Sequence, residues 1–351
     1  MQRSFIDSYR ISRRTFAAAA AAAAAFGSSL FAAPSRAAEP EKRDVTIAVG
    51  GKNLYYYLPM ALADWMGFYK EEGLDVRVVD FQGGSKSLQA VVGGSADVVS
   101  GAFEHTLSMQ QKRQPMRAFV LQGRAPQCVF AVSRKAMPNF ARVEELKGRR
   151  IGVTAPGSSS HVIANYVLAR AGIKPNEVAV IGIGSGAGAV AAVRAGQVDA
   201  FVGLDPVISQ LEGEEAIRIV TDTRDVKASD ALFGGPMVAG CLYAPQRFLD
   251  QHPETCRRLA RAVVRAERLI AQADPDEIMK HVPKAAFLGN PELYRTGFIK
   301  NRPALSADGR FPEGCAEISA AALASVNPAL ADFRFNFETV FTNAFVDAAK
   351  A

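Results

Sequence analysis

Apolar runs and helix-like stretches alternate along residues 45–103, and the same order returns along residues 150–206. In the first stretch, VTIAVG is an apolar run ending in glycine, and LPMALADWMGFY then places apolar residues at helical spacing. In the second, RRIGVT is the run, PGSSSH is the loop and HVIANYVLARAG is the helix. Alternating strands and helices predict parallel sheets with right-handed crossovers.

The repeat extends past the first helix of each unit. LDVRVVDF and EVAVIGIG are the next predicted strands, each followed by a small-residue loop and a short helix. GGSADVVSGAFE in the first unit then corresponds to AGQVDAFVGLDP in the second. The chain therefore contains one α/β unit twice, which predicts two α/β lobes, each a mainly parallel sheet with helices on both faces.

Two predicted strands have no counterpart in the repeat. They cover residues 128–134 and 237–245, and they bracket the second unit. We interpret them as paired hinge strands that cross between the lobes. This predicts one lobe from residues 38–132 and 240–351, with the other, residues 133–239, inserted into it.

The first 37 residues have the composition of an export signal. Arg13 and Arg14 precede nine alanines, and small residues around Ala37 are typical of a cleavage site. The paired arginines predict a twin-arginine type of signal and a periplasmic location. No cysteine lies at the cleavage point to carry a lipid, and no later apolar run reaches the roughly 20 residues that span a bilayer.

Charge and cysteine usage exclude several function classes. The whole chain has a formal charge of +6, but residues 1–37 contain five arginines and one aspartate, so little excess charge remains to indicate a nucleic-acid partner. A helix predicted near residues 253–273 has a basic face that is either solvated or a docking face for a partner protein. No CxxC pair or nearby histidine indicates a metal site. A bridge between Cys128 and Cys241 stays open, although cytoplasmic folding before export disfavours an obligatory one.

Loops at the carboxyl ends of the predicted strands are the candidate binding site, because ligands of open α/β sheets bind there, beside helix N-termini. Each loop alone could be a capped helix start or a tight turn, but the recurrence of six such loops favours a site between the lobes. The six loops cover residues 51–56, 82–87, 101–105, 156–161, 185–188 and 203–206.

One of these loops resembles a dinucleotide fingerprint. Gly184, Gly186 and Ala189 fit GxGxxA after a strand, and Asp205 follows about twenty residues later. An exported oxidoreductase with a nucleotide cofactor is therefore an alternative. The short helix that follows, and the absence of the fingerprint from the first unit, disfavour it.

Catalytic motifs are not evident in the sequence. None of the four histidines has a serine or cysteine in a nucleophile-elbow context, and no phosphate-binding loop is present. Glu104 and His105 could transfer a proton, but ligand binding is the preferred interpretation. We therefore expect neither an enzyme nor a cofactor.

Several segments resemble a known family, in the order VTIAVGG, YYYLPMALADWMGFYKEEGLDV, FQGGSKSLQAVVGGSADVVSGAFEH, ELKGRRIGVTAPGSSSH and AAVRAGQVDAFVGLDP. The chain resembles the periplasmic solute-binding proteins of ABC importers, in the nitrate, sulfonate and taurine branch that also includes pyrimidine-precursor binders. The resemblance implies a two-lobed type II periplasmic binding protein fold that closes on a small organic anion or a related heteroaromatic. It also implies a monomer that delivers its ligand to separate permease and ATPase subunits. A eukaryotic branch makes a thiamine pyrimidine and carries a cysteine-rich motif, which this sequence lacks.

The resemblance also implies roles for residues in the six loops. Lys52 would pair with an anion or with Glu104, while Tyr56 or Tyr57 with Phe103 would cover an apolar body and Tyr55 would pack inward. Glu104 and Asp205 would accept from a donor on the ligand, or would brace the hinge. The remaining predicted ligand-binding residues, as hydrogen-bond donors or close backbone contacts, are Asn53, Gly84, Ser85, Gly157, Ser158, Ser159, Ser160, Ser185 and Gly186.

Overall fold

The computed structural model describes residues 38–81 and 83–349, so the predicted signal at residues 1–37 lies outside the described residues. Two five-stranded sheets form its framework. The first sheet has the order β2-β1-β3-β10-β4, and the second has the order β7-β6-β8-β5-β9. The strands of the first are β1 (Asp44–Val49), β2 (Asp75–Asp80), β3 (Val98–Ala102), β4 (Met116–Leu121) and β10 (Gly240–Pro245). Those of the second are β5 (Val129–Ser133), β6 (Arg150–Val153), β7 (Ala179–Gly182), β8 (Ala200–Gly203) and β9 (Ile217–Asp222).

The two sheets share one topology, which confirms the predicted α/β fold. β1 pairs in parallel with β2 and β3, and β6 pairs in parallel with β7 and β8. In each sheet one strand runs antiparallel to its two neighbours, β10 in the first and β5 in the second. We use lobe 1 and lobe 2 for the first and second sheets with their helices.

The two strands outside the repeat do not themselves cross between the lobes. β5 lies wholly in the second sheet and β10 in the first, so the crossings precede them. Gln122 and Gly123 donate backbone N–H groups to the Gly240 carbonyl at 2.7 and 3.0 Å, and Ala239 donates to the Gly123 carbonyl at 2.9 Å. The first crossing therefore comes before residue 129 rather than after residue 132. The sequence prediction missed this because an apolar strand has the same residue pattern in either sheet.

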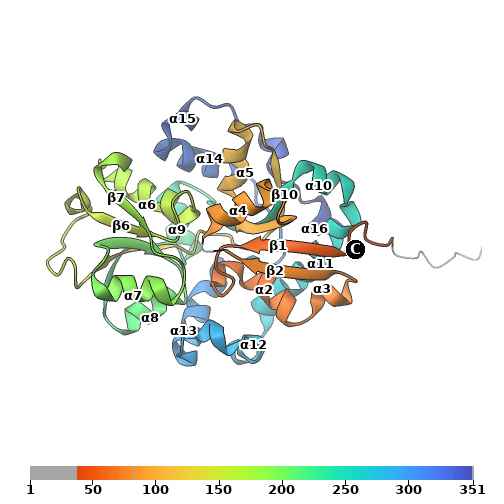
Figure 1. The fold of residues 1–351 in the computed structure, drawn as a ribbon, viewed down its shortest axis with the longest axis horizontal. Coiled ribbons are helices and arrows are strands. Elements are labelled where there is room, and N and C mark those ends of the chain that lie inside the picture. The colour runs from red at the N-terminus through yellow and green to blue at the C-terminus, as the bar shows by residue number, and fades with distance from the viewer. Residues whose placement is uncertain (1–37, 82, 350–351) are drawn as a thin grey trace, which may run out of the picture. The chain divides into compact units, whose positions relative to one another are not determined.

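Helices cover both faces of the sheets, and Figure 1 shows α4 on one side of β1 and β2, with α2 and α3 on the other. The lobe 1 helices before the first crossing are η1 (Tyr55–Tyr57), α2 (Leu58–Trp65), α3 (Phe68–Glu71), α4 (Gly84–Val92) and α5 (Glu104–Gln111). Those of lobe 2 are η2 (Val143–Leu146), α6 (Ser159–Arg170), η3 (Pro175–Glu177), α7 (Ala187–Ala195), α8 (Val207–Gly213) and α9 (Val226–Phe233).

The segment after β10 is helical and contacts both lobes. α11 and α16 pack near β4 of lobe 1, whereas α13 contacts α8 and α14 contacts α6 in lobe 2. The helices of this segment are α10 (Gln246–Gln251), α11 (Pro253–Gln272), α12 (Pro275–His281), η4 (Lys284–Phe287), α13 (Pro291–Asn301), η5 (Arg302–Ala304), α14 (Cys315–Val326), α15 (Pro328–Ala331), η6 (Phe337–Thr339) and α16 (Ala344–Ala348).

The basic face of α11 is largely neutralised within the chain. Arg261 pairs with Glu72 at 2.8 Å, and Arg265 pairs with Glu71 at 2.8 Å while its guanidinium lies 4.1 Å from the Phe68 ring centre. The helix's own Glu254 pairs with further arginines. The arginines therefore attach α11 to the segment around α3, a role that the helical pattern alone did not reveal.

All four cysteines are buried free thiols, so Cys128 and Cys241 are not bridged. Burial raises the pKa of each thiol above its usual range. Within residues 38–81 and 83–349, no helix is both long enough and apolar enough to cross a bilayer.

Candidate functional site

The N-termini of three helices meet between the two lobes: α4 begins at Gly84, α5 at Glu104 and α6 at Ser159. A small cavity lies there, with Tyr56, Tyr57 and Gly84 on the lobe 1 side and Ser158, Ser159 and Ser160 on the lobe 2 side. Its volume is about 20 Å³, which is room for roughly one water molecule. The lobes are therefore closed on each other in this structure.

The three consecutive tyrosines divide between the protein core and this cavity. Tyr55 packs against Tyr294 with ring centres 4.6 Å apart, and its hydroxyl donates to the Tyr294 carbonyl. Tyr56 and Tyr57 both line the cavity and pack edge to face, with ring centres 4.9 Å apart. They sit in a 3-10 turn, whose three residues per turn direct neighbouring side chains to different sides.

Glu104 is the most unusual group near the cavity. Its side chain is 1% exposed, and neither carboxyl oxygen has a hydrogen-bond partner among the described residues. The buried Tyr56 hydroxyl likewise has no hydrogen-bond partner within the described part of the chain. Burial raises the pKa of Glu104, and the nearby Ser159 hydroxyl, which makes no hydrogen bond of normal geometry to this carboxyl group, offsets the rise only in part. Such groups cost free energy when they are buried without partners, so this pair is the strongest candidate for contact with a ligand.

Hydrogen bonds from lobe 1 to lobe 2 close the rim of the cavity. Ser85 donates its N–H to Ser158 Oγ at 3.1 Å, and its hydroxyl donates to the Pro156 carbonyl at 3.0 Å. A β-carbon at Gly83, whose φ is +113°, would lie 2.5 Å from the Ala155 β-carbon. Glycine at this position therefore permits the close approach of the two lobes.

His105 supplies a further bond across the rim. Its Nε2 lies 3.3 Å from the Gly157 carbonyl oxygen of lobe 2, and its Nδ1 lies 2.8 Å from the Tyr243 hydroxyl. A carbonyl can only accept, so we assign the proton to Nε2, which leaves Nδ1 to accept from Tyr243. Burial lowers the pKa of His105 to about 4.

This histidine should make the folded protein sensitive to acid. The pKa of His105 is lower in the folded than in the unfolded state, so stability is complete above pH 6.5 and falls as the pH drops toward 4. We expect His105→Gln to remove about 3 kcal/mol of the pH-dependent loss in the free energy of unfolding. Urea denaturation at several pH values measures this, with exposed His281→Gln as the control. Parallel pH profiles for the wild type and His105→Gln would contradict the assignment.

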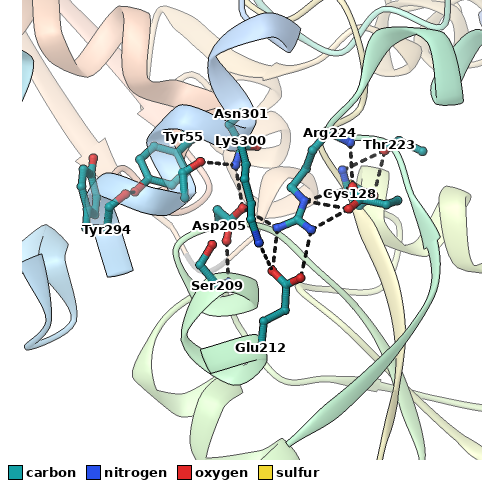
Figure 2. Close-up of polar contacts among 12 residues, drawn as sticks. Tyr55, Cys128, Asp205, Ser209, Glu212, Thr223, Arg224, Tyr294, Lys300 and Asn301 are labelled. Atoms are coloured by element: carbon teal, nitrogen blue, oxygen red, sulfur yellow. Dashed lines mark hydrogen bonds and ion pairs between the residues drawn. The ribbon is translucent and has the colours of Figure 1, made fainter. Parts of the chain in front are cut away.

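Asp205 lies in a buried polar cluster rather than in the cavity (Figure 2). Its carboxylate accepts from the Ser209 N–H at 2.6 Å, from Arg224 Nη1 at 3.1 Å and from Asn301 Nδ2 at 2.6 Å. Arg224 also pairs with Glu212 and with Asp222. Because these groups already donate to the Asp205 carboxylate, the structure favours a role in bracing the hinge over contact with a ligand.

The same cluster joins lobe 2 to the segment after β10. Asn301 ends α13, and the next residue, Arg302, donates to the Ala271 carbonyl at the end of α11. The Asp205 carbonyl also accepts from the Tyr55 N–H at 3.2 Å, directly before the cavity residue Tyr56. The cluster therefore links the closed lobes at a point next to the candidate site.

Other predicted site residues lie outside the cavity. The Lys52 side chain is exposed, and Phe103 is buried against Phe311 with ring centres 5.5 Å apart. Gly157 is on the rim described above. Asn53, Ser185 and Gly186 line a separate pocket of about 90 Å³.

The cavity also has lining residues that the sequence did not single out. Thr154 shares a hydrogen bond of 2.8 Å with Ser160, which turns that serine's hydroxyl toward β6. The other four are one glycine and three apolar residues. The three apolar residues fall within predicted loops, but their residue types do not distinguish them from core residues. The four are Gly50, Leu54, Ala102 and Leu204.

The geometry disfavours the dinucleotide alternative. The space beside Gly184, Ser185 and Ala189 has a volume of about 10 Å³, which is far below the size of a cofactor site. Asp205, the acidic residue that would hold the ribose, is already engaged by Arg224 and Asn301.

A model of the NMT1-like family matches residues 38–282. The chain belongs to the NMT1-like family. This NMT1-like protein is 23% identical over 244 residues to the Saccharomyces cerevisiae 4-amino-5-hydroxymethyl-2-methylpyrimidine phosphate synthase THI13, covering 67% of this chain and 69% of that protein. The family resemblance expected from the sequence is thereby confirmed.

Solved structures similar to this NMT1-like protein show the same fold. A protein from Bordetella bronchiseptica RB50 is 51% identical, with a TM-score of 0.87 over 89% of this chain and 98% of that one. The alkanesulfonate-binding protein SsuA from Xanthomonas axonopodis pv. citri, solved with bound MOPS, has a TM-score of 0.68 at 20% identity, over 89% of this chain and 99% of that one. The periplasmic binding protein fold predicted from the sequence is confirmed.

Proposed function

We propose that this protein is the periplasmic substrate-binding component of an ABC importer, and that its two lobes close on one small molecule. It would be exported by the twin-arginine signal, act as a monomer and deliver its ligand to separate permease and ATPase subunits. The family and the fold support a binding role. The observation that carries the proposal is that Glu104 and Tyr56 are buried without hydrogen-bond partners among the described residues. Tyr56 lines the closed cavity, and Glu104 lies behind the lining, near Tyr56 and Ser159.

The same pair supports a proposal about the class of ligand. A carboxylate accepts hydrogen bonds and repels anions, so Glu104 favours a ligand with an N–H donor, such as an amine or an amino-substituted heterocycle. Tyr56 and Tyr57 add aromatic surface suited to a flat ring. Lys52, the basis for expecting an organic anion, is exposed and lies outside the cavity. The product named for the yeast relative is an aminopyrimidine phosphate, which shares the amino-substituted ring of this ligand class and also carries an anionic group.

A thermal-shift screen tests this proposal. Amino-substituted pyrimidines, other amino-heterocycles and primary amines without an acidic group should stabilise the wild-type protein, whereas alkanesulfonates without an amino group and nitrate should not. A ligand at 100 times its dissociation constant adds about 2.7 kcal/mol to the free energy of unfolding, a shift that the screen detects easily. Stabilisation by sulfonates or nitrate alone would overturn the assignment of the ligand class.

An enzymatic role is the second candidate, because the yeast relative is named as a synthase. Incubating the purified protein with each stabilising compound, followed by mass spectrometry, separates the two roles. Quantitative recovery of the unchanged compound supports binding and transport. A new product that forms in proportion to protein concentration would replace the transport proposal with a catalytic one.

A further inference from the structure

A second and larger cavity lies outside the rim of the closed site. It is a groove of about 520 Å³ between α4 and α5 of lobe 1 and α6 of lobe 2, with the end of α14 as its fourth wall. Ser85 and His105 belong to its lining, so the rim separates the groove from the inner cavity. Its volume falls in the range of small-molecule sites, which the inner cavity does not reach in this closed state.

The charge of the groove favours an anion. No aspartate or glutamate is among its lining residues. Lys112, at the end of α5, contributes an ammonium group for which the described part of the chain supplies neither an ion pair nor a hydrogen bond. An ammonium group that is not neutralised nearby attracts a carboxylate, with a strength that depends on salt.

Two polar groups on α6 add directional contacts. His161 Nδ1 accepts from the Gly157 N–H at 3.0 Å, so in the neutral ring Nε2 carries the proton and can donate to a ligand. Asn165 also lines the groove, and its Oδ1 atom has no exposed surface and no hydrogen-bond partner among the described residues, so the side-chain amide must rotate about χ2 to present this atom to a ligand. A buried acceptor of this kind calls for a donor that the chain does not provide.

We propose that this groove is a second ligand site, distinct from the inner cavity, for a small carboxylate that also carries a hydroxyl or amino donor. Lys112 and the Nε2–H of His161 bind the carboxylate, and Asn165 Oδ1 accepts from the donor. Both lobes contribute walls, so occupancy of the groove favours the closed arrangement. The proposal does not depend on which compound binds in the inner cavity.

Isothermal titration calorimetry with two matched probes tests the site. Citrate carries a hydroxyl next to its carboxylates, and tricarballylate is the same skeleton without that hydroxyl. The wild-type protein should bind citrate at one site, about five- to tenfold more tightly than tricarballylate. In Asn165→Ala the two probes should bind equally, because the acceptor for the hydroxyl is gone.

Variants of charged residues complete the test. Lys112→Ala should weaken citrate binding about tenfold at low salt, while Lys227→Ala, an exposed change on α9, should leave it unchanged. Tyr56→Phe should also leave citrate binding unchanged, because Tyr56 lines the inner cavity. The proposal is overturned if citrate shows no saturable binding up to about 10 mM, if Lys112→Ala binds citrate as the wild type does, or if Tyr56→Phe abolishes binding.

Discussion

Replacing Arg224 with methionine should lower the free energy of unfolding by about 3–5 kcal/mol, because it leaves a buried carboxylate without its counter-ion. The Asp205 side chain has no exposed surface and that of Arg224 is 5% exposed. Ser209 and Asn301 would still donate to Asp205, but neither group carries a positive charge. Urea denaturation at neutral pH measures the loss.

Two further variants identify the cause of this loss. Asp205→Asn combined with Arg224→Met should recover part of the stability, since the unpaired charge is then absent. Arg268→Met, an exposed change on α11, should alter the free energy of unfolding by less than about 0.5 kcal/mol. A loss below about 1 kcal/mol for Arg224→Met would mean that the cluster is not a tightly coupled buried network.

Glu104→Gln should have opposite effects on stability and on ligand binding. Removing an unpartnered buried charge should raise the free energy of unfolding by about 1–3 kcal/mol at neutral pH. The same change should weaken ligand binding about 10- to 100-fold, because a hydrogen bond to a charged acceptor is replaced by one to a neutral amide. Chemical denaturation and titration of the ligand from the thermal-shift screen measure the two effects.

The stabilisation by Glu104→Gln should depend on pH. The pKa of Glu104 is raised in the folded state, so the wild type loses stability as the pH rises from the unfolded-state value through the folded-state value. The advantage of glutamine should therefore be largest at neutral pH and disappear in acid.

Glu267 offers a matched control for this variant. It is a fully buried glutamate on α11 whose carboxyl oxygens also lack hydrogen-bond partners in the described structure, and burial raises its pKa well above the usual range. Glu267→Gln should stabilise the protein in the same direction and leave ligand affinity unchanged. If Glu104→Gln behaved in the same way as Glu267→Gln, Glu104 would not contact the ligand.

The framework of the fold could be predicted because its signals are local and repeated. Each unit places apolar runs, glycine loops and helical periodicity in the same order, and the sheets pair these runs as expected. The sheet that each unrepeated strand joins could not be predicted. Strands that are buried on both faces, such as β5 and β10, show no alternation of polar and apolar residues from which their neighbouring strands could be predicted.

The candidate site was harder to predict because exposure depends on how each loop turns. Gly51 and Lys52 donate their backbone N–H groups to Asp80 at 2.7 and 3.2 Å, and the lysine side chain remains exposed. Asp205 lies nineteen positions before Arg224, so no local pattern joins them. The residue types in the loops indicated polar chemistry, but only tertiary contacts show which groups already have partners.

The closed rim has a consequence for the rate at which the proposed ligand can bind. A molecule larger than a water does not fit in a space of about 20 Å³, so the proposed ligand can bind only after the serine, histidine and aspartate contacts between the lobes separate. The rate of ligand entry is then limited by how often these contacts break together, on the microsecond-to-millisecond scale of domain motions or slower. If the protein acts in import as proposed, a membrane partner that pulls on either lobe would hasten release of the ligand without contacting it.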